Sequence, residues 1–114
     1  MKAYLIDPAA RTVEQVQYSG DYHQIYELIG ASTFDVAYIN AKRDGLFVDD
    51  EGMLRDPETQ SYFLVQGCPN PLAGKALCLG CNDEGESVAP RITLQELRQR
   101  VIWIDHHSVL KRKG

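Results

Sequence analysis

The stretch from Lys2 to Gly30, KAYLIDPAARTVEQVQYSGDYHQIYELIG, decides the fold class because its apolar pattern changes period partway along. Residues 2–7 and 12–18 alternate apolar and polar side chains, which is typical of half-buried strands. From Asp21 onward the apolar residues recur at helical spacing instead. The stretch therefore predicts a β-hairpin followed by an α-helix.

The ends of this helix have recognisable signals. Asp21 and Gln24 have the spacing of a capping box, in which each side chain binds a backbone N–H of the first turn. Gly30 follows the last apolar residue, where a left-handed C-cap is common. We expect the helix to begin at Asp21 and to end before Gly30.

The rest of the chain continues the same alternation of elements. Asp44-Gly45 predicts a tight hairpin turn, and Thr93 with Glu96 predicts the capping box of a second helix. The stretch 61–66 fits either a strand or one helical turn. The other predicted strands cover residues 34–40, 46–48, 75–80 and 101–104.

The element order β-β-α-β-β-β-α-β predicts an α+β fold, with a mostly antiparallel sheet of about five to six strands and two helices packed on one face. Residues 1–105 are expected to form one domain, and residues 106–114 a flexible basic tail. The edge strands of such a small sheet allow pairing with a second copy, so a homodimer is one expected state.

Charge and hydropathy limit the classes of partner. The chain has 114 residues and a net charge of −4, although Lys111-Arg112-Lys113 are basic. An acidic body repels phosphate, which disfavours nucleic-acid binding through it and favours a protein partner. No apolar run is long enough for a membrane span, and Asp7-Pro8 ends the first run too early for a signal peptide. We expect a location in the cytoplasm of a bacterial host.

Two acidic segments end in glycine: LFVDDEGML, which contains Asp49, Asp50 and Glu51, and the segment at residues 82–86. Consecutive carboxylates in an extended chain point to opposite faces, unlike the alternating ligands of a calcium loop. Glycine after a polar cluster is typical of a turn. Both segments are therefore predicted to be turns.

The cysteines present a zinc alternative. Cys78-Leu79-Gly80-Cys81 is half of a zinc site, which Cys68 and His106 or His107 would complete. Against this, Cys78 lies in an apolar strand pattern, where a thiol behaves as a small hydrophobe. We expect no metal and no cofactor, and keep a zinc-dependent nucleic-acid binder as an alternative.

No motif for catalysis is present, so we expect no enzyme activity and no catalytic residue. A second alternative is a domain that binds or hydrolyses a nucleotide or another small ligand, with His23, Arg91 or Lys75 as anion contacts. Tyrosine is common at protein interfaces because it joins a large apolar ring to one polar group. The expected partner-binding residues are Tyr22, Tyr26, Asp49, Asp50 and Glu51.

Three strings carry a family resemblance: IDPAARTVEQVQYSGDYHQIYELIGASTFDVAYI, FVDDEGML and NPLAGKALCLGCNDEGESVAPRITLQELRQRV. Over residues 1–101 the chain resembles a family of small uncharacterised proteins carried by phages, prophages and plasmids. The resemblance implies a cytosolic accessory protein of a mobile element that binds a host protein. An inhibitor of a host defence complex, of the restriction or CRISPR type, is one such role.

Overall fold

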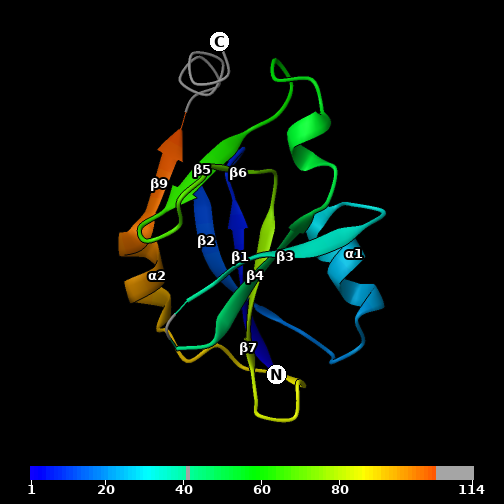
Figure 1. Cartoon of the computed structure of the whole chain (residues 1–114), viewed down its shortest axis with the longest axis vertical. Coiled ribbons are helices and arrows are strands. Elements are labelled where there is room, and N and C mark those ends of the chain that lie inside the picture. Colours follow the sequence, from blue (N-terminus) through cyan, green and yellow to red (C-terminus); the bar gives the residue numbers. More distant parts are fainter. Residues whose placement is uncertain (41, 105–114) are drawn as a thin grey trace.

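The structure is a computed structural model that describes residues 1–40 and 42–104 (Figure 1). Its elements are β1 (Lys2–Asp7), β2 (Thr12–Gln17), α1 (His23–Ile29), β3 (Phe34–Ile39), β4 (Asp44–Asp49), a 3-10 turn η1 (Gly52–Leu54), β5 (Tyr62–Val65), β6 (Leu72–Ala73), β7 (Ala76–Cys81), β8 (Ser87–Val88), α2 (Leu94–Arg100) and β9 (Val101–Ile104). The α+β class is as predicted.

The main sheet is antiparallel, with the strand order β2-β1-β7-β4-β3 and with β8 paired to the end of β7. β7 is the central strand, because Ala76 lies opposite both Ile6 of β1 and Val48 of β4. The predicted hairpin of the first two strands is confirmed. A second small sheet, of order β6-β5-β9, was not predicted.

The two helices cover opposite faces of the main sheet, which corrects the prediction of one shared face (Figure 1). Successive side chains of a strand point to opposite faces. Cys78 of β7 belongs to the same core cluster as Leu97 of α2, whereas Leu77 belongs to that of Ile25 in α1. The run Ala76–Cys81 is apolar at every position except Gly80 because both of its faces are buried.

The small sheet and α2 together cover one face of the main sheet. Phe63 and Val65 of β5 join the cluster around Cys78, and Val101 and Trp103 of β9 pack against it. The strand prediction for residues 101–104 is confirmed, as is the strand alternative at residues 61–66.

The start of α1 differs from the predicted capping box. Asp21 Oδ1 accepts from the backbone N–H of His23 at 3.0 Å, and the side chain of Gln24 accepts from the N–H of Ser19 at 2.7 Å. In a capping box, Asp21 would bind the N–H of Gln24, and Gln24 would bind the N–H of Asp21. Each side chain instead binds an N–H one or two residues earlier, and the helix begins at His23. Gly30 is left-handed, with φ of 67°, as predicted.

The hairpin turn between β3 and β4 is also displaced from its predicted place. Arg43 N–H donates to Asn40 O, and Asn40 N–H donates to Asp44 O, each at 3.0 Å. Arg43 has a φ of 67°, a left-handed conformation that glycine normally takes. Asp44 and Gly45 lie in β4 instead, and a Cβ on Gly45 would lie 3.2 Å from Val36.

The second helix begins as predicted. Thr93 is its N-cap, and its Oγ1 accepts from the backbone N–H of Glu96 at 3.1 Å. In the described part of the chain, neither helix is long and apolar enough to cross a membrane. The predicted tail, residues 106–114, lies outside the described residues.

Candidate functional site

A group of aromatic rings lies at the start of α1, and we call Tyr22, His23 and Tyr26 the aromatic surface. Tyr22 and His23 are exposed, and Tyr26 is half-buried. The rings of Tyr22 and His23 stack with centroids 4.2 Å apart, and Tyr22 meets Tyr26 edge-on at 6.3 Å. Tyr22 is 55% exposed. His23 Nδ1 lies 2.8 Å from Asp21 Oδ1, and hydrogen bonds from the backbone and ring of His23 lower the pKa of Asp21.

The aromatic surface is connected to the core by further ring contacts. The ring centroid of Tyr26 lies 4.9 Å from that of Phe34 in β3, and the centroid of Phe34 lies 5.7 Å from that of Phe47 in β4. Phe34 and Phe47 pack against the buried cluster that contains Ile25. Rings held on both sides lose little freedom when a partner covers them. The structure thus places Tyr22 and Tyr26 side by side, at one edge of the main sheet.

The acidic segment turns at Asp50 and Glu51, directly after Asp49 ends β4, so a turn is present as predicted. Asp49 Oδ1 accepts from the N–H of Glu51 at 2.9 Å, and Oδ2 accepts from Arg55 Nε at 2.8 Å. The Asp49 side chain is only 9% exposed, so its carboxylate serves the turn. Asp50 and Glu51 are exposed and available to a partner.

The two glycines of the acidic turns have different physical roles. Gly85 has a φ of 81° and open space around it, so that turn needs the left-handed conformation, as expected. Gly52 is needed for space instead, because a Cβ there would lie 2.9 Å from Ala73 O.

The described cysteines do not converge on one point. Cys78 and Cys81 are three positions apart on β7 and therefore face opposite sides of the sheet. Cys68 shares the buried cluster of Cys78, but its Sγ donates to Asn70 O at 3.4 Å. Within residues 1–40 and 42–104, no three His, Cys, Asp or Glu side chains form a metal-binding group. The remaining ligand of the zinc alternative, His106, lies outside the described residues.

The three predicted anion contacts lie at different places. His23 belongs to α1, while Arg91 precedes α2 on the other face of the sheet. Lys75 lines a cleft of about 290 Å³ at the end of the main sheet, together with Arg55, Asp7 and Asp49. The cleft is therefore lined by both positively and negatively charged side chains.

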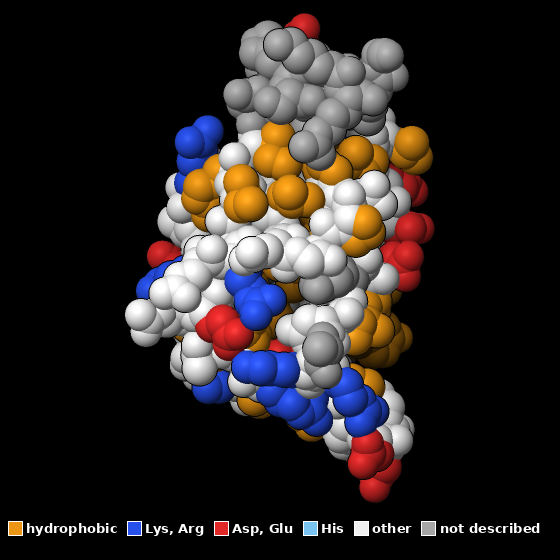
Figure 2. All heavy atoms as spheres, turned by 60° about the vertical axis from the view of Figure 1, so that its left-hand side comes forward, with side chains coloured by type: hydrophobic (Ala, Val, Ile, Leu, Met, Phe, Trp, Pro, Cys, Tyr) orange, Lys and Arg blue, Asp and Glu red, His pale blue; other side chains and the backbone are white. Residues whose placement is uncertain are grey.

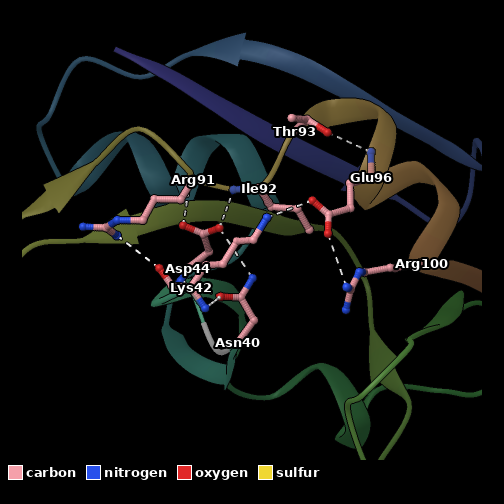
Figure 3. Close-up of polar contacts among 8 residues, drawn as sticks. All are labelled: Asn40, Lys42, Asp44, Arg91, Ile92, Thr93, Glu96 and Arg100. Atoms are coloured by element: carbon pink, nitrogen blue, oxygen red, sulfur yellow. Dashed lines mark hydrogen bonds and ion pairs between the residues drawn. The ribbon is translucent and has the colours of Figure 1, made fainter.

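A buried polar junction, which sequence reasoning missed, lies between β4 and α2 (Figure 3). Asp44 is 2% exposed. Its Oδ1 accepts from the N–H of Arg91 and its Oδ2 from the N–H of Ile92, each at 2.8 Å. Asn40 Nδ2 donates to Asp44 Oδ2 at 3.4 Å. A buried carboxylate with this many donors is satisfied, so it fixes the segment before α2 onto the sheet.

Next to this junction lies a group of cations that we call the basic face: Lys42, Arg43, Arg91 and Arg100. Glu96 accepts from Lys42 Nζ at 3.1 Å and from Arg100 Nη2 at 3.3 Å, and Arg43 pairs with Asp83 (Figure 3 shows the Glu96 contacts). Arg91 Nη1 donates to Lys42 O at 3.4 Å. The cations come from segments about fifty positions apart, so no local sequence pattern reveals the face.

Comparison with known proteins gives one family. Residues 1–102 match the family model of a domain of unknown function, DUF3846. No curated protein and no solved structure matches the chain significantly. Because the match covers most of the chain, this protein belongs to the DUF3846 family.

Proposed function

We propose that this protein acts without catalysis, by binding another protein through the aromatic surface of Tyr22, His23 and Tyr26. The observation that carries the proposal is that Tyr22 is more than half exposed yet held in contact with two other rings. Aromatic side chains of this kind supply much of the binding energy at protein interfaces.

Two features support a contact that extends beyond the rings. Tyr26 packs on Phe34, and Phe34 lies directly opposite Asp49 in the β3–β4 pair. The exposed side chains of Asp50 and Glu51 follow at the end of β4, the strand that pairs with β3. A surface with aromatic residues at its centre and charged residues at its rim fits a protein partner.

The proposal also includes where the protein acts and on which kind of target. The sequence resemblance supports a cytoplasmic accessory protein carried by a mobile element, with a host defence complex as its target. The second candidate function is the binding of a small ligand, and the cleft at Lys75 favours it because its volume is close to that of small-ligand sites.

The proposal is tested by affinity purification from a bacterial host of wild-type protein and of Tyr22→Ala. Ile102→Ala is the matched control, since Ile102 is an apolar side chain that is 51% exposed on β9, in the small sheet away from α1. Any protein retained by the wild type is then purified, and its dissociation constant is measured with all three chains.

We expect Tyr22→Ala to weaken binding by at least tenfold, about 1.4 kcal/mol or more, as for an aromatic hot spot. Ile102→Ala should bind as the wild type does. Equal affinity of Tyr22→Ala and wild type would refute the aromatic surface as the contact. A thermal shift with a nucleotide or another small ligand, abolished by Lys75→Ala, would favour the second candidate instead.

A further inference from the structure

We propose that the basic face of Lys42, Arg43, Arg91 and Arg100 binds an acidic segment of a partner protein, whose carboxylates displace those of Asp83 and Glu96. This goes beyond the proposed function, because it concerns residues on the α2 side of the sheet. It is tested without reference to the aromatic surface.

Charge is strongly segregated over the molecule. The basic face has four cations against two carboxylates, Asp83 and Glu96. All other described residues together carry five Lys or Arg and thirteen Asp or Glu; of these carboxylates, Asp44 is buried at the junction, and Glu84 and Glu86 share the turn of Asp83. Figure 2 shows several Lys and Arg side chains close together across the lower half of the side turned forward, with Asp and Glu side chains beside them. A cationic face on an acidic protein steers an anionic partner to one place.

The basic face already binds carboxylates in a defined geometry. Glu96 lies between Lys42 and Arg100, at 3.1 Å and 3.3 Å, and hydrogen bonding to Lys42 lowers the pKa of Glu96. The carboxylate of Asp83 binds Arg43, which also donates from Nη2 to Asn82 O at 3.0 Å. The Asp83 side chain is 93% exposed. Exposed ion pairs contribute little to stability, so a partner's carboxylates can replace these internal ones.

The turn that presents Arg43 has an unfavourable backbone conformation. Arg43 has a φ of 67°, where a residue with a Cβ is disfavoured and glycine is not. The turn is held in this form by Asn40 Oδ1, which accepts from the N–H groups of Lys42 and Asp44 at 2.9 Å each. Strain that surrounding contacts maintain is a feature of functional sites. Here the strain keeps a guanidinium at the rim of the basic face.

An acidic protein segment fits this face better than a nucleic acid does. A short peptide covers only the cations, whereas the phosphates of a duplex continue beyond the face and meet the acidic remainder of the surface. The four residues of the face include no aromatic ring on which a base would stack. Arginine forks bind carboxylates through paired hydrogen bonds, and three of the four cations are arginines.

The experiment uses Arg43→Gly, with Arg11→Gly as its matched control. Arg11 also has a positive φ, of 57°, so both substitutions remove one positive charge and relieve the same kind of strain. The two residues lie at opposite ends of the main sheet: Arg11 follows β1, whose Ile6 pairs with Ala76, while Arg43 precedes Asp44, which pairs with Gly80. Binding of a fluorescein-labelled oligoglutamate peptide is measured by anisotropy at low salt.

We expect Arg43→Gly to weaken peptide binding about tenfold and Arg11→Gly to change it less than about twofold. Both variants should have an unfolding temperature equal to or above that of the wild type. Weaker binding would then not be caused by loss of the fold. The proposal is overturned if the wild type does not bind the peptide, or if both variants weaken binding equally, since net charge alone then explains it. Tighter binding of a short DNA duplex that depends on Arg43 overturns the partner class.

Discussion

The carboxylate of Asp44 accepts a hydrogen bond from the backbone N–H of Ile92 at 2.8 Å, although the two residues are 48 positions apart. Ile92 is buried in the core cluster that α2 joins. The contact therefore fixes the entry of α2 onto the sheet. It also explains why a charged residue is tolerated at 2% exposure in a strand.

Replacement of Asp44 should strongly destabilise the fold. Asp44→Ala leaves the buried N–H of Ile92 and the partly buried N–H of Arg91 without acceptors, and we expect a loss of about 3 kcal/mol in the free energy of unfolding. Urea denaturation followed by circular dichroism measures this. The control is Asp83→Ala, which removes an exposed carboxylate and should leave stability unchanged. Equal midpoints for Asp44→Ala and wild type would show that the junction does not stabilise the fold.

The N-cap of α2 offers a second, smaller prediction. Thr93→Ala removes the acceptor for the Glu96 N–H, and we expect a loss of about 1 kcal/mol. Thr93→Ser keeps the hydroxyl and should retain most of the stability. Thermal unfolding of the three proteins distinguishes them, and similar losses for Ala and Ser would rule out the hydroxyl as the cause.

The two turn glycines should respond differently to the same substitutions. Gly85→Ala is expected to cost about 1 kcal/mol for its positive φ, and Gly85→Asn less, because asparagine tolerates the left-handed region. Gly52→Ala should cost about 2 kcal/mol through contact with Ala73, and Gly52→Asn more. The order of midpoints in urea checks this, and recovery of stability by Gly52→Asn would contradict the steric reading.

The thiol of Cys78 should be unreactive in the folded protein. Burial, and secondarily the charge of Asp44, raise its pKa to about 12 from an ordinary value near 9. We therefore expect iodoacetamide at pH 8 to label the half-buried Cys81 first and to reach Cys78 only on unfolding. Mass spectrometry of timed samples shows the order, and early labelling of Cys78 would mean that the core opens locally.

The same pKa shift predicts a dependence of stability on pH. Above pH 9 the unfolded chain ionises the Cys78 thiol while the folded chain keeps the proton, so stability falls as pH rises from about 9 to about 12. Cys78→Ala removes this contribution, and its urea midpoint should fall less between pH 8 and pH 10 than the wild-type midpoint. Parallel falls in the two proteins would exclude Cys78 as the source.

Local signals in the sequence predicted local structure well. The hairpin of residues 2–18, the C-cap at Gly30 and the N-cap at Thr93 depend on near neighbours, and all three are present. The turn at Asn40–Arg43 was missed because an arginine in a left-handed conformation has no sequence signal, while Asp44-Gly45 imitates a hairpin turn.

The arrangement of the elements was harder to predict. The apolar run of β7 indicated that both faces of its sheet are covered, and this signal was available in the sequence. The basic face and the Asp44 junction join residues about fifty positions apart in the chain, so only the fold brings them together. The proximity of Tyr22 and Tyr26 followed from helical spacing, but their connection to Phe34 did not.

The central place of β7 has a consequence for synthesis. The hairpins β1–β2 and β3–β4 are each complete early in the chain, but both pair with β7 on its two sides. Until residues 76–81 have left the ribosome, each hairpin has one strand edge without its native neighbour. Folding of the main sheet therefore requires the insertion of a late strand between two early ones, a long-range step of the kind that slows folding and exposes edges to aggregation.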